Sequence, residues 1–136
     1  MKKTLSLLSL LVLSLGAGVL HAQPVTGKAG LLTDAAGRVL YVFDKDSEGK
    51  SVCYDPCAAL GPPFLAAADA KPAGDYGLVT RSDGSRQWAV RGRPLYFYAA
   101  DSVPGQATGD GVKGVWHVVR DTPATGDAGS YRPKEY

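Results

Sequence analysis

The amino-acid sequence predicts an all-β protein: a single compact antiparallel β domain built from two pseudo-symmetric repeats, with few or no helices after an N-terminal signal peptide. Three observations predict this fold. One phrase occurs twice, as "GRVLYVFDKDS" at 37–47 and "GRPLYFYAADS" at 92–102, with six identical positions in eleven. Short β-branched and aromatic runs alternate with turn residues, as in chains of short strands. Long helical periodicity is absent after residue 22.

The first 22 residues have the three-part pattern of a secretory signal. Lys2 and Lys3 precede the apolar run "LSLLSLLVLSLGAGVL", and Ala22 suits the position before a cleavage site. The alternative is a membrane anchor that is retained, but the run is short for a bilayer and ends in glycines. We therefore expect a soluble periplasmic or secreted protein with no stable membrane anchor after cleavage.

Charge and length narrow the function classes. The chain has 15 basic and 13 acidic residues, and the signal peptide contains two of the lysines, so the mature chain is formally neutral. A neutral chain lacks the electrostatic footprint of nucleic-acid binding, and no such partner is expected. The remaining 114 residues suffice for one domain with one core.

The mature chain divides into five segments. After a lead-in at 23–29, we expect a two-repeat β domain over 30–120, with repeat 1 at 30–66, a linker at 67–76 and repeat 2 at 77–120. The linker is rich in small and polar residues. Residues 121–136 contain almost no large aliphatic side chain, which predicts a flexible C-terminal tail.

The strand "RVLYVF" at 38–43 is apolar on both faces. Val39, Tyr41 and Phe43 would lie on one face, with Leu40 and Val42 on the other. Such a strand is usually interior to a sheet and covered on both sides. "PLYFY" at 94–98 repeats the pattern, so we expect both strands to be central.

Turns and breaks separate these strands. The segments 34–37 ("DAAG") and 82–85 ("SDGS"), together with the pair 91–92 ("RG"), are typical of hairpin turns. The alanine-rich segment after Cys57 allows one turn of helix, which Gly61 and the two prolines after it would end. Because one hairpin and one strand bury too little surface alone, we expect the two copies to share a core.

The doubled motif Tyr-x-(Phe/Tyr)-x-x-Asp resembles the signature of a family of secreted bacterial repeat proteins and lipoproteins of unknown function. The likeness covers most of residues 30–120. It implies an exported repeat domain with no established activity. Gly61 stands where family members often carry Trp, which implies that repeat 1 lacks an aromatic packing anchor. The motif residues are Tyr41, Phe43, Asp46, Tyr96, Tyr98 and Asp101.

Cys53 and Cys57 are the only cysteines of the chain. In an exported protein the default is a disulfide, here closing a short loop. The alternatives are a redox-active pair or a thiolate metal site. The C-x3-C spacing is one residue longer than the usual C-x-x-C redox motif.

His117, in the strand pattern "VWHVV", is the only histidine after the signal peptide. It could act as a general base or a metal ligand. No serine or cysteine nucleophile motif accompanies it, so we expect a hydrogen-bonded histidine within a strand.

The motif side chains allow two roles. The paired aromatic rings could form a stacking platform for a ligand. More often such rings fill a core, with their hydroxyls bonded at its edge. Each aspartate would then accept backbone N–H groups where its strand ends. We expect the structural role for both copies.

These observations predict a monomeric, non-enzymatic module without a cofactor, which binds an unknown envelope protein or small ligand through the loops beyond the two motif strands. The alternative is a periplasmic redox or metal-handling protein that uses Cys53, Cys57 and His117.

Overall fold

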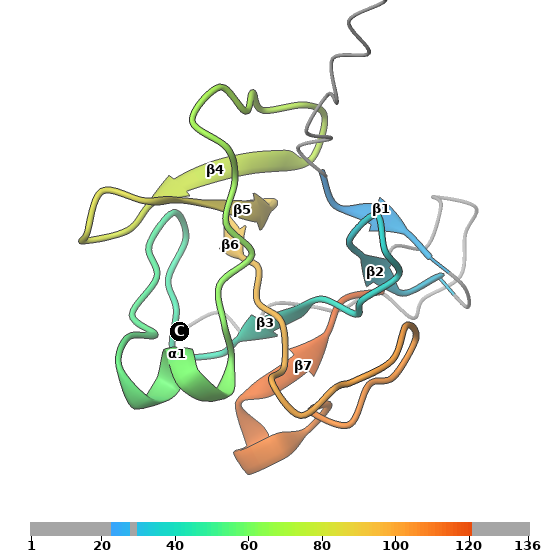
Figure 1. The fold of residues 1–136 in the computed structure, drawn as a ribbon. Coiled ribbons are helices and arrows are strands. Elements are labelled where there is room, and N and C mark those ends of the chain that lie inside the picture. Colours follow the sequence, from blue (N-terminus) through green and yellow to red (C-terminus); the bar gives the residue numbers. More distant parts are fainter. Residues whose placement is uncertain (1–22, 28–29, 121–136) are drawn as a thin grey trace, which may run out of the picture.

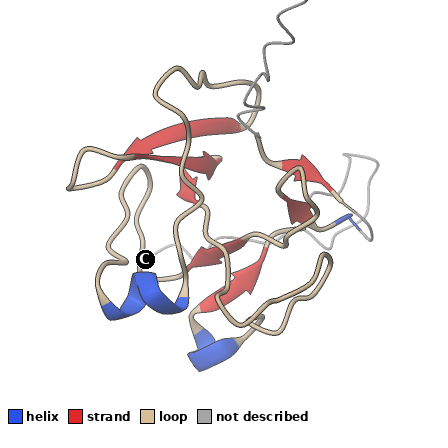
Figure 2. Cartoon of the chain, viewed as in Figure 1, coloured by secondary structure: helices blue, strands red, loops and turns tan. Residues whose placement is uncertain are grey.

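The computed structural model describes residues 23–27 and 30–120. Short antiparallel strands dominate this part of the chain, which confirms the predicted all-β class (Figures 1 and 2). The sheets have the orders β1-β2, β3-β7 and β4-β5-β6. The predicted signal peptide and C-terminal tail lie outside the described residues. The elements are β1 (Val25–Thr26), β2 (Leu32–Thr33), β3 (Tyr41–Phe43), α1 (Pro56–Leu60), β4 (Tyr76–Thr80), β5 (Arg86–Val90), β6 (Arg93–Pro94), the 3-10 turn η2 (Val112–Gly114) and β7 (Trp116–Val118).

Two equivalent tyrosines pair with each other at the centre of the fold. Tyr41 and Tyr96 occupy the same place in the doubled phrase, 55 residues apart. The Tyr41 N–H donates to the Tyr96 carbonyl at 2.8 Å, and the Tyr96 N–H donates to the Tyr41 carbonyl at 2.9 Å. Because equivalent residues pair reciprocally in an antiparallel bridge, an approximate twofold axis passes between them.

The last segment of each repeat pairs with the other repeat across this axis. β7, at the end of repeat 2, pairs with β3 of repeat 1, with Val118 opposite Tyr41 (Figure 1). Pro63, the counterpart of Val118 in repeat 1, pairs with Tyr96 of repeat 2. Each repeat therefore completes the sheet of the other, and the predicted pseudo-symmetry takes an interlocked form.

Further backbone bonds repeat this exchange beyond the central strands. The Asp44 N–H donates to the Val115 carbonyl at 2.8 Å, and the equivalent Ala99 N–H donates to the Leu60 carbonyl at 2.8 Å. The same 55-residue offset relates both partners of the two bonds. The pairing between the two repeats therefore continues beyond the central tyrosines.

The central strand divides the core into two clusters, as its alternation predicts. Leu40 and Val42 pack in one cluster with Trp88 and Leu95. The tyrosines pack in the other, whose buried members are Val39, Tyr41, Phe43, Cys53, Tyr96, Trp116 and Val118. Tyr41 and Tyr96 have no exposed surface. Both motif strands are therefore interior, as predicted.

The predicted turns form by local hydrogen bonding and backbone conformation. Asp34 Oδ1 accepts the N–H groups of Ala36 and Arg38, which closes the turn before the central strand. Arg91 and Gly92 both have positive φ, 45° and 79°, the conformation of a two-residue hairpin turn. They join β5 to β6, with Val90 opposite Arg93.

Helix α1 is a single turn that ends at Gly61, as predicted. Gly61 is required here for space. A Cβ at this position would lie 2.2 Å from Cη2 of Trp116. Trp116 is the counterpart of Gly61 in repeat 2, 55 residues later. Repeat 1 is therefore not without an aromatic anchor, because the indole of repeat 2 fills that place.

Candidate functional site

The first motif aspartate is bound to the second motif tyrosine. The Tyr96 hydroxyl donates to Asp46 Oδ2 at 2.5 Å, and Asp46 Oδ1 accepts the Val52 N–H at 2.8 Å. The hydroxyls of Ser51 and Tyr96 are also bonded, at 2.6 Å. Asp46 is only 5% exposed. The sequence predicted the backbone bond to the aspartate but not the bond from a tyrosine of the other repeat.

The second motif aspartate repeats this arrangement. The Tyr41 hydroxyl donates to Asp101 Oδ2 at 2.5 Å, while Asp101 Oδ1 accepts the Thr108 N–H at 2.9 Å. The Tyr41 hydroxyl also accepts the Gly109 N–H at 3.2 Å. We call these two reciprocal Tyr–Asp contacts the clasps. Each clasp joins repeat 1 to repeat 2.

Burial governs the protonation of the clasps. It raises the pKa of the Tyr41 and Tyr96 phenols well above their ordinary value, and the aspartate that accepts each hydroxyl adds to the effect. Burial also raises the pKa of the Asp46 carboxyl, although the hydrogen bond from Tyr96 opposes that change. The tyrosines therefore remain neutral donors at physiological pH.

The second aromatic of each motif packs inside the protein. The Phe43 and Trp116 rings lie 4.6 Å apart between centroids. Tyr98 packs against Tyr41 at 5.7 Å and covers Gly109, where a Cβ would approach its ring to 2.4 Å. The motif rings therefore fill space between the repeats.

A buried arginine that the sequence did not single out extends the first clasp. Arg81 Nη1 donates to Gln87 Oε1 at 2.8 Å and to Ser51 Oγ at 3.0 Å. Its Nη2 donates to the Cys53 carbonyl at 2.7 Å. The guanidinium carbon also lies 4.4 Å from the centre of the Tyr54 ring. In the sequence Arg81 is distinguished only by its position just before the predicted turn at 82–85. Its burial could therefore not be predicted.

The predicted Cys53–Cys57 disulfide is confirmed, with Cα atoms 5.2 Å apart. Cys53 has no exposed surface, and Cys57 is half-buried. In the disulfide both sulfurs are in the oxidised form, so neither is a thiolate that could bind a metal. The disulfide therefore argues against the metal-handling alternative.

His117 lies at the surface of β7 and contacts one carboxylate. Its Nε2 is 2.7 Å from Asp44 Oδ2, and Arg93 Nη2 is 3.8 Å from Asp44 Oδ1. The structure places His117 against Asp44 and does not bring it together with the cysteines. In the part of the chain that the structure describes, no group of three His, Cys, Asp or Glu side chains is placed to hold a metal ion.

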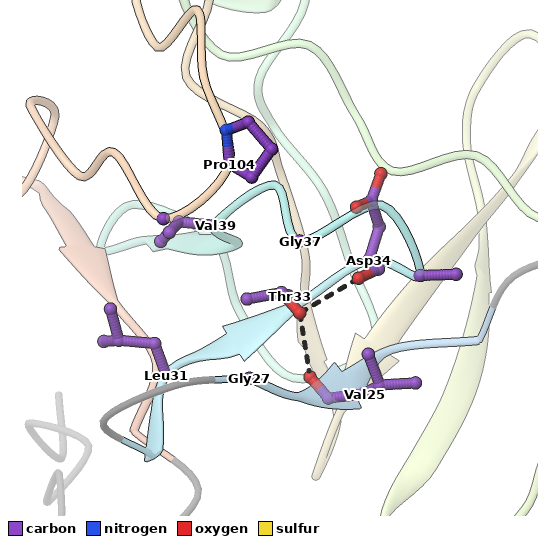
Figure 3. Close-up of a pocket in the computed structure, with 10 residues that line it drawn as sticks. Val25, Gly27, Leu31, Thr33, Asp34, Gly37, Val39 and Pro104 are labelled. Carbon is purple, nitrogen blue, oxygen red and sulfur yellow. Dashed lines mark hydrogen bonds between the residues drawn. The ribbon is translucent and has the colours of Figure 1, made fainter.

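An open apolar cavity of about 530 Å³ lies beside the turn at 34–37 (Figure 3). Its apolar walls come from Val25, Leu31, Ala35, Val39 and Pro104. In Figure 3, Pro104 lies across from Val25, with Thr33 between them. No sequence motif predicted this cavity, because part of its wall, Pro104 and Gly105, comes from the other repeat.

The walls of this cavity are held by hydrogen bonds. The Gly105 N–H donates to the Gly37 carbonyl at 2.9 Å, which ties the loop beyond the second motif strand to the hairpin turn. Thr33 Oγ1 donates to the Asp34 carbonyl at 2.9 Å. Asp34 Oδ1 already accepts two backbone N–H groups. We call the cavity beside the turn at 34–37 the apolar cavity.

Comparison with known proteins gives one match. A family model described as a secreted repeat of unknown function matches residues 24–64 and 77–120. No curated protein matches the chain, and no solved structure matches it either. Among the described residues, no helix has the length and apolar character needed to cross a membrane.

Proposed function

This chain belongs to the family of secreted repeats of unknown function, and from that premise we propose that it is a non-enzymatic module of the periplasm that binds a small apolar ligand in the apolar cavity. Export is common to the family. The periplasmic destination rests on the signal pattern of residues 1–22.

This proposal rests on the contacts that the motif side chains make within the protein. Tyr41, Tyr96 and both motif aspartates bond to one another across the repeats. The two cysteines bond to each other. These polar groups hold the fold together, so recognition is left to the loops and to the surface between them.

The apolar cavity is the surface best suited to a ligand. Its volume of about 530 Å³ lies in the range of small-molecule sites, which are mostly apolar with a few fixed polar groups. Val25 is 41% exposed at its edge, whereas Val39 is 2% exposed in its wall. An apolar ligand would cover the exposed surface of Val25 and remove it from water.

A matched pair of substitutions tests the site. Ala35 lines the cavity, whereas its exposed neighbour Ala36 belongs to the same turn outside it. Ala35→Trp should fill the cavity and weaken binding of the uncharged fluorescent probe N-phenyl-1-naphthylamine by about tenfold or more. The Ala36→Trp variant should bind the probe with the same affinity as the wild-type chain. Equal binding by both variants, or no binding by the wild type, would contradict the proposal.

One observation supports a second candidate, a periplasmic redox role. Half-buried Cys57 lines a cavity of about 260 Å³ together with Lys45 and Lys113, and neighbouring lysines favour a reactive thiolate. A dithiol reductant should then open the bond in the folded protein within minutes. A bond that stays closed until the chain unfolds would remove this candidate, as mass spectrometry of alkylated samples can show.

A further inference from the structure

A second concave surface lies where strand β4 ends, and residues of both repeats line it. One cavity of about 360 Å³ is lined by Val52, Tyr54 and Thr80. An adjoining cavity of about 520 Å³ includes Leu65 and Asp83. Tyr54 and Ser82 line both cavities, and the Ser82 N–H donates to the Tyr54 hydroxyl at 2.9 Å. We call the two cavities together the β4 groove.

The edge of β4 leads into this groove. The Arg91 N–H donates to the Asp75 carbonyl and the Arg81 N–H to the Ser85 carbonyl, each at 2.8 Å. This alternation directs Gly77 and Val79 toward β5 and turns the backbone groups of Leu78 and Thr80 to the outer side. Strand β4 is the outermost strand of its sheet. Residues 76–80 contain no charge and no proline to oppose strand addition.

The groove has an apolar wall and an acidic rim. Leu65 is 52% exposed and Val52 is 45% exposed. The exposed carboxylates of Asp55 and Asp83 belong to the larger cavity. Hydrogen bonds from the Ser85 side chain and N–H lower the pKa of Asp83, so this group is ionised at neutral pH.

Arg81 lines the larger cavity and its charge contributes to the lowered pKa of Asp83, but its guanidinium forms its hydrogen bonds with other groups. Arg81 is 5% exposed, and its Nη atoms donate to Ser51, Gln87 and the Cys53 carbonyl. Its charge is therefore directed into the protein. The larger cavity therefore presents two carboxylates beside the exposed Leu65, whereas the exposed Lys50 lines the smaller cavity beside Val52.

We propose that the β4 groove binds an extended, basic segment of a partner protein. The segment adds a strand by pairing its backbone with Leu78 and Thr80. A lysine or arginine of the segment reaches the carboxylates of Asp55 and Asp83 beyond the end of β4. This surface is separate from the apolar cavity, so the proposal stands independently of the small-ligand function.

The test uses the mature chain and a fluorescein-labelled peptide of alternating valine and threonine with a central lysine. Fluorescence anisotropy should show that this peptide binds about tenfold more tightly than its glutamate counterpart at low salt. The double substitution Asp55→Asn and Asp83→Asn should remove that preference. Asn has nearly the same shape as Asp, so both substitutions should leave the fold intact.

Two controls make the result specific. Asp75→Asn removes a carboxylate of 66% side-chain exposure that pairs with Arg91, and it should leave the lysine preference intact. N-methylation of the peptide backbone on the side facing β4 should weaken binding, because strand addition needs those N–H groups. Absence of binding, a preference that survives the double substitution, or indifference to N-methylation would overturn the proposal.

Discussion

At the scale of single residues, Tyr41 and Tyr96 explain why the chain repeats its motif. Each hydroxyl reaches the aspartate of the other repeat. A typical intramolecular hydrogen bond contributes about 0.5–1.5 kcal/mol to stability, and one to a charged group about 1.5–3 kcal/mol. The sequence predicted that each aspartate caps its own loop. It could not predict the tyrosine partner, because a motif read along the chain carries no information about contacts 50 and 60 residues away.

The clasp tyrosines predict a specific alkaline titration. Burial raises the pKa of both phenols, so the folded state favours the neutral form. Their contribution to stability is complete below a pH of about 10, the ordinary tyrosine pKa. It is lost as the pH rises from there toward the raised pKa of the folded state. Of the seven tyrosines, two should therefore ionise only as the protein unfolds, which tyrosinate absorbance and circular dichroism can follow together.

Matched variants identify these two groups. Replacing both clasp tyrosines by phenylalanine should remove the delayed phase, provided that circular dichroism shows the variant folded at neutral pH. Tyr54→Phe should instead remove a group that titrates in the folded protein, because hydrogen bonds from Ser82 lower the pKa of Tyr54. Early ionisation of all seven tyrosines in the folded chain would contradict the assignment.

At the scale of elements, local chemistry predicted the turns, the helix end and the disulfide. Asp34 closes its turn through its own neighbours, and Gly61 with its prolines ends α1. These features depend on residues close in sequence. The pairing of β7 with β3 and the apolar cavity both depend on contacts between segments of the two repeats. Neither could be predicted from local pattern.

Gly61 gives a prediction at this scale. Gly61→Ala should lower the free energy of unfolding by about 1–3 kcal/mol, because its Cβ would overlap the buried Trp116 indole. Trp116→Leu should also destabilise the fold by leaving a cavity. The two changes together should cost less than their sum, since the smaller side chain makes room. Urea denaturation of the four chains measures this.

Gly77→Ala is the control for that experiment. A Cβ at Gly77 meets nothing within 4 Å, so this change should alter stability by less than about 0.5 kcal/mol. A Gly61→Ala chain as stable as the Gly77→Ala chain would show that the indole does not occupy the space beside residue 61.

At the scale of the whole molecule, the two repeats are not neighbouring units but interlocked halves. The doubled phrase predicted two copies that share a core, and the paired tyrosines of the two repeats lie at its centre. The sequence did not indicate that the last segment of each repeat pairs with the other repeat. Both clasps join the two repeats, and so does the last segment of each repeat. We therefore expect the described domain to unfold as one cooperative unit.

Double-mutant cycles on the clasps test the central claim, that each motif tyrosine is bound to the aspartate of the other repeat. The cycles combine Tyr→Phe and Asp→Ala substitutions and use the free energy of unfolding in urea. Coupling energies of about 1–2 kcal/mol are expected for Tyr41 with Asp101 and for Tyr96 with Asp46. The pairs within one repeat, Tyr41 with Asp46 and Tyr96 with Asp101, should couple by less than about 0.5 kcal/mol. Strong coupling within repeats and none between them would contradict the interlocked fold.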